Sequence, residues 1–232
     1  NQFAYYSKNI FEYPDSSHYA LRYKIGEVHN IDPNRIICGA GSDEIIQLLC
    51  RCFCEKNDEV IYTEHGFLMY KLSALAAGAK PVKVKENNRI ASVENISEAV
   101  TSRTKIIFLA NPNNPTGNVP TKQEIDDFIS LARDFPRCTI IADEIYDGLD
   151  FSGNFVSLAS RSQDVPVIVL NGVSKVYFAP GWRIGYMAWH DPSGVLSNVR
   201  DGAERLLRSR LCASTPAQYG YLAGLSEESD WM

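Results

Sequence analysis

The sequence predicts an α/β fold built on a mostly parallel sheet with helices on both faces. Short apolar runs alternate with longer segments of helical period along the 232 residues. Several of the short runs are β-branched and do not alternate with polar residues, which indicates strands covered on both faces. Hydrophobic residues make up 45% of the chain and charged residues 22%, so the material for a large core is present. No repeat, linker or low-complexity tract interrupts the pattern, and we expect one domain over 1–232.

Seven strands are expected in this sheet. They cover 35–39, 59–63, 81–85, 105–111, 139–143, 165–170 and 184–189. Clear helical patterns cover 42–53, 121–135, 193–212 and 216–225. The second of these helices starts with the capping-box pair Thr121 and Glu124. Ligands of such sheets bind in loops at the carboxyl ends of the strands, so we expect the functional site there.

Charge, hydropathy and cysteine usage exclude several classes of function. The net charge of −5 offers no large basic field for nucleic acid. No run approaches the roughly 20 apolar residues that span a bilayer, and no signal-peptide pattern opens the chain, so a cytoplasmic location is expected. The only cysteine cluster is "CRCFC", in which a helix would place Cys50 and Cys54 on one face and Cys52 elsewhere. Buried apolar cysteines are therefore expected there, and no metal site.

Three loops that follow strands carry unusual polar residues. In "CGAGSDE" a helix begins at Ser42 and Asp43, and its free N–H groups either hold a phosphate or form an ordinary helix start. The loop "NPNNPTG", 111–117, contains more asparagines than a simple turn needs. In "ADEIYDG", Asp143 and Glu144 end a buried strand, where a carboxylate must be paired or solvated. It either caps a turn or holds a cationic ring nitrogen.

The segment "NGVSKVYFAPGWRIGY", 171–186, places a lysine and an arginine between two apolar strands. Lys175 is either an ordinary solvated lysine or a desolvated amine that attacks carbonyls, with Arg183 as the neighbouring cation. Arg183 is also a ready phosphate clamp. A Schiff-base lysine, a phosphate cradle, an acid for a pyridinium and an asparagine-rich loop are together the parts of a pyridoxal phosphate site.

These motifs, in this order, resemble the fold-type-I pyridoxal-phosphate aminotransferases of classes I and II over nearly the whole chain. Residues 1–130 resemble histidinol-phosphate aminotransferases through "EYPDSSHYALR", "GAGSDEIIQLL" and "EHGFLMYKLSALAAGAKPV". Residues 138–232 resemble archaeal-type alanine/aspartate aminotransferases through "DEIYDGLDFSG" and "LRSRLCASTPAQYGYLAGL". Mixed ancestry or an engineered chimera would explain this switch. The resemblance implies a three-layer α/β/α large domain.

The resemblance also implies a cofactor, pyridoxal 5′-phosphate, and a role for each residue around its ring. Lys175 is implied to be the Schiff-base lysine and the proton carrier. Asp143 is implied to pair with the ring nitrogen. Tyr146 and Asn114 are implied to bond the ring oxygen O3′, and Phe67 to stack on the ring.

The phosphate group of this cofactor has its own implied set of contacts. Arg183 and Ser174 are implied to hold it. They are joined by the loop at Gly41 and by the backbone N–H groups of Ser42 and Asp43. A second subunit completes the set, because Tyr13 matches a family tyrosine that reaches the partner's phosphate. A homodimer with its active site near the interface is therefore expected.

The implied reaction is amino transfer between an amino acid, or histidinol phosphate, and a 2-oxo acid, as in amino acid biosynthesis. A pyridoxal-phosphate lyase or decarboxylase of the same fold is an alternative. Another is a truncated or engineered domain that binds the cofactor with little turnover. The family's N-terminal segment and small C-terminal domain, with the arginine for the substrate α-carboxylate, are expected to lie outside this sequence. The amino donor is not determined by the sequence.

Overall fold

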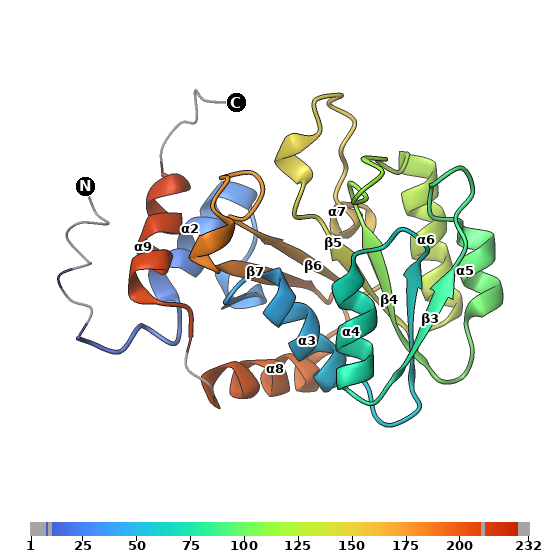
Figure 1. The fold of residues 1–232 in the computed structure, drawn as a ribbon, viewed down its shortest axis with the longest axis horizontal. Helices are drawn as coiled ribbons and strands as arrows, with labels where there is room; N and C mark the ends of the chain where they lie inside the picture. Colours follow the sequence, from blue (N-terminus) through green and yellow to red (C-terminus); the bar gives the residue numbers. More distant parts are fainter. Residues whose placement is uncertain (1–7, 9–10, 210–211, 227–232) are drawn as a thin grey trace.

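A single sheet of seven strands forms the centre of the molecule (Figure 1). A computed structural model describes residue 8, residues 11–209 and residues 212–226. The strands are β1 Ile36–Gly39, β2 Glu59–Thr63, β3 Lys80–Val84, β4 Thr104–Ala110, β5 Thr139–Asp143, β6 Val167–Gly172 and β7 Gly185–His190. Their order in the sheet is β1-β7-β6-β5-β4-β2-β3, and only β7 runs antiparallel to its neighbours. The predicted sheet, seven-stranded and mostly parallel, is confirmed.

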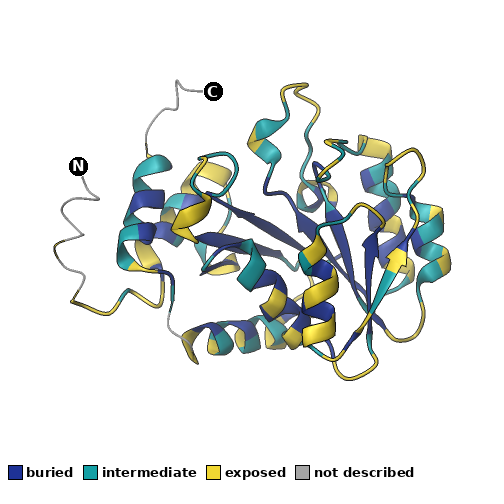
Figure 2. Ribbon diagram, in the orientation of Figure 1, coloured by how far each residue is buried: buried dark blue, intermediate teal, exposed yellow. Residues whose placement is uncertain are grey.

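Helices cover both faces of this sheet and make a three-layer α/β/α arrangement. The helices are α2 Tyr19–His29, α3 Ser42–Phe53, α4 Leu68–Ala76, α5 Val93–Ala99, α6 Lys122–Asp134, α7 Leu158–Arg161, α8 Ser197–Ser209 and α9 Thr215–Gly224, with short 3-10 turns at Pro33–Arg35, Asp147–Leu149 and Pro180–Trp182. Helices α3, α4 and α8 share one apolar core, while α2, α5, α6, α7 and α9 share the other. Successive residues of one strand alternate between the two cores, as Ile140 and Ile141 do in β5. The sheet is accordingly buried on both faces (Figure 2).

Two predicted segments start two or more positions before the observed ones, and the other starts agree to within one residue. The strand expected from 165 begins at Val167, because Pro166 has no N–H to donate to the sheet. The helix expected from 193 begins at Ser197, because Gly194, with φ +72°, closes a turn onto the Asp191 carbonyl. The observed helix ends at Ser209, residues 210–211 lie outside the described residues, and the predicted end at Cys212 is wrong because Cys212 is not helical.

The carboxyl ends of six strands lie along one edge of the sheet. Strands β2, β3, β4, β5 and β6 are parallel. Strand β1 joins them because it and β6 both run antiparallel to β7. The loops after these strands carry the glycine-serine loop, the asparagine-rich loop, the Asp143 loop and the lysine–arginine segment, so the fold brings those motifs together.

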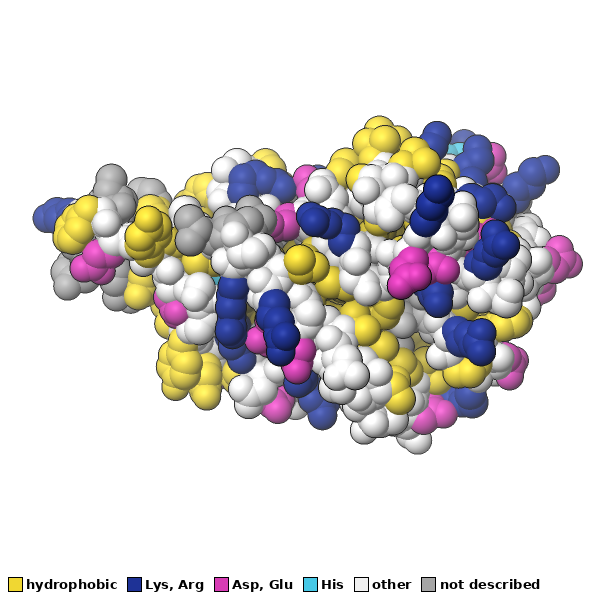
Figure 3. All heavy atoms as spheres, turned by 90° about the horizontal axis from the view of Figure 1, so that it is seen from below, with side chains coloured by type: hydrophobic (Ala, Val, Ile, Leu, Met, Phe, Trp, Pro, Cys, Tyr) yellow, Lys and Arg dark blue, Asp and Glu magenta, His cyan; other side chains and the backbone are white. Residues whose placement is uncertain are grey.

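Charged side chains of both signs lie on the surface, and four of the six cysteines are buried. On the face shown in Figure 3, basic and acidic side chains are interspersed with apolar ones. Within the described part of the chain, no helix is long and apolar enough to cross a membrane, and no cluster of side chains could hold a metal ion. All six cysteines are free, with Cys50 and Cys54 buried and Cys52 partly exposed, as predicted.

The predicted capping box at the start of α6 generates a stability test. The Thr121 hydroxyl accepts the Glu124 N–H at 3.2 Å, and the Glu124 carboxylate accepts the Thr121 N–H at 2.7 Å. Thr121→Ala should lower the free energy of unfolding by about 1 kcal/mol, because one helix N–H loses its acceptor. Urea denaturation measures this, and Thr121→Ser, which keeps the oxygen, is the control. Equal losses in both variants would contradict the assignment.

Candidate active site

A pocket opens at the carboxyl edge of the sheet, on the side of α3 and α4. It encloses about 580 Å³, part of which is open to solvent. Its lining contains nine of the residues selected from the sequence: Ser42, Asp43, Phe67, Asn114, Asp143, Tyr146, Ser174, Lys175 and Arg183. It also contains residues that were not selected, among them Tyr70 and Ile145. Residues up to 141 positions apart in the sequence thus meet in one hollow.

One end of the pocket is a cationic cradle at the N-terminus of α3. Gly41 precedes this helix with φ +92°, and a Cβ there would lie 2.6 Å from Nη2 of Arg183. Only glycine therefore allows the guanidinium to approach so closely. Nη2 of Arg183 lies 3.1 Å from a carboxylate oxygen of Asp43, and Nη1 donates to the Pro180 carbonyl at 3.1 Å. The first N–H groups of α3 and an arginine thus face the same space, which suits a phosphate.

The opposite end of the pocket holds the buried carboxyl of Asp143, at the end of β5. Asp143 is 4% exposed. Oδ2 accepts a hydrogen bond from the Tyr70 hydroxyl at 2.7 Å, whereas Oδ1 has no hydrogen-bond partner in the described part of the chain. Burial raises the pKa of Asp143 to about 6, and the charge of Asp43 adds to this. The Tyr70 bond and the charge of Lys175 act in the opposite direction. An acid with one unused oxygen is suited to a cationic N–H donor.

Tyr70, in the first turn of α4, is a site residue that the sequence analysis missed. It is 1% exposed and stacks on Phe108, with ring centroids 4.5 Å apart and planes 5° apart. Phe67 meets it edge to face at 5.9 Å. Its position three residues after Phe67 was the available signal, since i and i+3 share a helix face. The carboxylate it bonds is 73 positions away, which no local pattern reports.

Tyr146 lies between the asparagine-rich loop, 111–117, and the segment that carries Lys175. Asn114 donates from Nδ2 to the Tyr146 hydroxyl at 3.0 Å. Nζ of Lys175 lies 5.3 Å from the centre of the Tyr146 ring. Because Tyr146 contacts both residues, the Lys175 amine, the Asn114 amide and the Tyr146 hydroxyl lie on one side of the pocket.

Helix α9 anchors the loop that carries both Lys175 and Arg183. Gly220 and Gly224 are four positions apart and share a helix face. A Cβ on Gly220 would overlap the Trp182 ring, and one on Gly224 would lie 3.2 Å from the Tyr177 ring. The Tyr177 and Trp182 side chains therefore pack where α9 has no side chain. The sequence analysis did not identify this contact.

Two of the selected residues do not line the pocket. Gly41 acts through its contact with Arg183, as described above. Tyr13 is 84% exposed and lies outside the pocket lining. Its expected reach to a partner subunit is not tested within one chain.

The family model for aminotransferases of class I and II matches residues 2–232. The chain belongs to the class I and II aminotransferases. It is 40% identical over 215 residues to the histidinol-phosphate aminotransferase of Paracoccus denitrificans, covering 87% of this chain and 57% of that protein. It is 44% identical over 182 residues to the histidinol-phosphate aminotransferase of a Ruegeria species, covering 76% and 48%.

Solved aminotransferase structures have the same fold. An alanine aminotransferase from Pyrococcus furiosus superposes with a TM-score of 0.92 at 35% identity, covering 97% of this chain and 60% of that one. An Escherichia coli aminotransferase gives a TM-score of 0.92 at 26% identity, covering 98% and 59%. The chain thus spans about half to three-fifths of the length of these relatives. The resemblance to both histidinol-phosphate and alanine aminotransferases is confirmed.

The raised pKa of Asp143 generates a test in the chain without cofactor. Because the native pKa of about 6 exceeds the ordinary 3.8, the native state binds more protons between these values. The free energy of unfolding should therefore fall as pH rises from about 4 to about 6. Asp143→Asn lacks this titration, so the difference between wild type and variant should change by about 3 kcal/mol across that window.

Denaturant unfolding between pH 4 and pH 7 measures this difference. Glu144, whose pKa burial raises to about 8, remains in both proteins, and its contribution cancels in the comparison. A wild-type-to-variant difference that is independent of pH would mean that Asp143 is not desolvated.

Proposed function

We propose that residues 1–232 form the cofactor-binding large domain of an aminotransferase that uses pyridoxal 5′-phosphate. The observation that carries the proposal is the unused oxygen of buried Asp143, which shares a pocket with Lys175 and the Arg183 cradle. Membership in a family that depends on pyridoxal phosphate supports it. The chemical class of the reaction is amino transfer between an amino acid and a 2-oxo acid.

The residues present fit each part of the cofactor. Arg183, Ser174 and the first N–H groups of α3 suit the phosphate, and Gly41 lets the Arg183 guanidinium approach this helix. The free oxygen of Asp143 suits the protonated ring nitrogen. The Tyr146 hydroxyl and Asn114 amide, already bonded to each other, suit the ring oxygen O3′. Phe67 lines the same pocket and suits a face of the ring.

When bound, the cofactor supplies an aldehyde that takes up the amino group and a ring that withdraws electrons from the substrate. The chain's own contribution is to position and to move protons. Lys175 would hold the cofactor through its amine and would carry the proton of the substrate carbon. Asp143 would pair with the ring nitrogen through a negative charge held in a desolvated place. The Tyr70 hydroxyl supports that charge.

The relatives suggest which substrates to test first. The curated proteins that match 76% or more of this chain at 40–44% identity are histidinol-phosphate aminotransferases, so histidinol phosphate with 2-oxoglutarate is the first pair. The Pyrococcus structure is an alanine aminotransferase, so alanine is the second donor. Both remain proposals, because the chain covers only part of either relative.

A second copy of the chain is the proposed partner. Helix α4 exposes Leu68, Leu72 and Leu75 at 61%, 44% and 52%, and their spacing places them on one face beside the pocket. Tyr13 is exposed and lies outside its own chain's pocket, which is compatible with a contact across subunits. A leucine face of this kind is typical of a surface that another protein covers.

The attachment point of the cofactor is tested by reduction. Borohydride treatment of the chain with pyridoxal phosphate should attach the cofactor covalently to Lys175, and peptide mapping locates the label. Lys175→Ala should lose the label, whereas Lys105→Ala, a lysine on β4, should keep it. Labelling mainly at Lys71 or Lys105 would refute the assignment, and absence of any label would refute the proposed function.

The dimer is tested by sedimentation. Wild type should sediment as a dimer at micromolar concentration, and Leu72→Glu should sediment as a monomer, because a charge would replace an apolar contact. Val28→Glu is the matched control, since Val28 is 48% exposed on α2. A monomeric wild type with cofactor bound would rule out the dimer.

A further inference from the structure

The loop at 85–91, after the edge strand β3, contributes no residue to the pocket lining. It is nevertheless a defined structure. Asn88 and Arg89 have φ of +53° and +65°, and Asn87 and Ile90 exchange backbone hydrogen bonds of 2.9 and 3.0 Å. Two positive φ values between a bonded pair correspond to a tight two-residue hairpin turn. We call residues 85–91 the outer loop.

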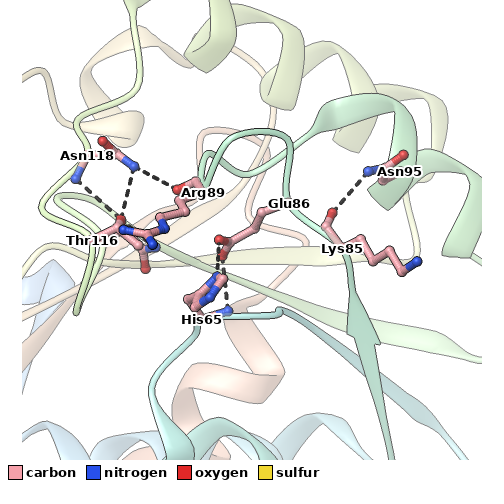
Figure 4. Close-up of polar contacts among 8 residues, drawn as sticks. His65, Lys85, Glu86, Arg89, Asn95, Thr116 and Asn118 are labelled. Atoms are coloured by element: carbon pink, nitrogen blue, oxygen red, sulfur yellow. Dashed lines mark hydrogen bonds and ion pairs between the residues drawn. The ribbon is translucent and has the colours of Figure 1, made fainter.

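The outer loop is bonded to the segment that starts α4. The Glu86 side chain is only 1% exposed, although glutamates are rarely buried without a partner. The His65 N–H donates to its Oε1 at 3.2 Å, and Nδ1 of His65 lies 2.7 Å from Oε2 (Figure 4). Nδ1 must carry a proton to face a carboxylate at this distance. Two residues after His65 comes Phe67, which lines the pocket.

The same loop is bonded on its other side to the asparagine-rich loop. The Arg89 carbonyl accepts a hydrogen bond from Nδ2 of Asn118 at 2.7 Å (Figure 4). The Asn118 carbonyl in turn accepts the Asn113 N–H at 2.9 Å. Asn113 directly precedes Asn114, the residue bonded to the Tyr146 hydroxyl. One loop outside the pocket therefore contacts both segments that place a side chain against the cofactor ring.

We propose that the outer loop is a brace, through which His65, Glu86 and Asn118 act as positioning residues for Phe67 and Asn114. The brace rests on the proposed function, since it positions residues for a cofactor in this pocket. The argument is one of geometry. A buried carboxylate bonded twice to one residue fixes the direction in which the chain enters α4, and that direction sets the side on which Phe67 lies. The Arg89 carbonyl, through Asn118, holds the segment that carries Asn114 against the same outer loop.

The test measures the bound cofactor by its dissociation constant and by its induced circular dichroism in the visible range, which depends on ring orientation. His65→Ala should weaken binding of pyridoxal phosphate about tenfold, the scale of a lost bond to a charged group, and alter the dichroic band. His65→Asn places an amide N–H near the position of Nδ1 and should restore both. Asn118→Ala should alter the band independently of His65.

Asn95→Ala is the matched control, because Asn95 on α5 donates to the Lys85 carbonyl at 3.0 Å and does not line the pocket (Figure 4). It should leave the dichroic band and the binding constant unchanged. If His65→Ala does not fold, Asn118→Ala and His65→Asn decide the question. A wild-type chain that binds cofactor, with unchanged bands in His65→Ala and Asn118→Ala, overturns the brace alone. A wild-type chain that binds no cofactor overturns the proposed function and the brace with it.

Discussion

The buried negative charge of Asp143 is the constraint on which the arrangement of the pocket depends. A carboxylate that is 4% exposed at the end of a central strand is costly to ionise, and its raised pKa expresses that cost. In the described part of the chain, Oδ2 is bonded to Tyr70, which brings α4 against the end of β5, and Oδ1 has no partner. Because Asp143 lines the pocket, a cationic ligand bound there would pair with its carboxyl group. A site that is incomplete without its ligand binds that ligand more tightly, because the ligand removes an existing penalty.

Close backbone approach is the second requirement of this site. A Cβ on Gly172 would lie 2.8 Å from the Gly185 Cα, and one on Gly185 would lie 3.3 Å from the Gly41 Cα. The absence of three side chains thus lets β6, β7 and the start of α3 converge. Arg183 extends into the resulting corner in a left-handed conformation, with φ +49°. The anchoring of Trp182 and Tyr177 on the glycine face of α9 holds the loop in place from outside. Arg183 is therefore positioned by this packing together with its bonds to Asp43 and to the Pro180 carbonyl.

The molecule divides stability and function between different parts of the same strands. The interiors of β4, β5 and β6 fill two apolar cores, one on each face of the sheet. Their carboxyl ends supply the polar loops. Although the chain spans about half to three-fifths of its relatives' length, it contains a sheet of seven strands and the pocket residues. The outer loop extends this division, because it acts on the site from the edge of the sheet.

The sequence by itself determined the layers, most element boundaries and the loops that carry the chemistry. Apolar β-branched runs give strands wherever both faces are covered, and the capping pair at Thr121 and Glu124 is a local interaction. Once the strands were parallel, their loops had to meet at one edge, which brought Ser42, Asp43, Asp143, Lys175 and Arg183 into one pocket; the other four pocket residues were expected from the family resemblance. Tyr70, the Trp182 contact with Gly220 and the His65–Glu86 pair were decided only by the tertiary structure. Each joins residues 21 or more positions apart. The contacts of the whole core together set the angle and register with which two elements pack, and no short segment contains those contacts.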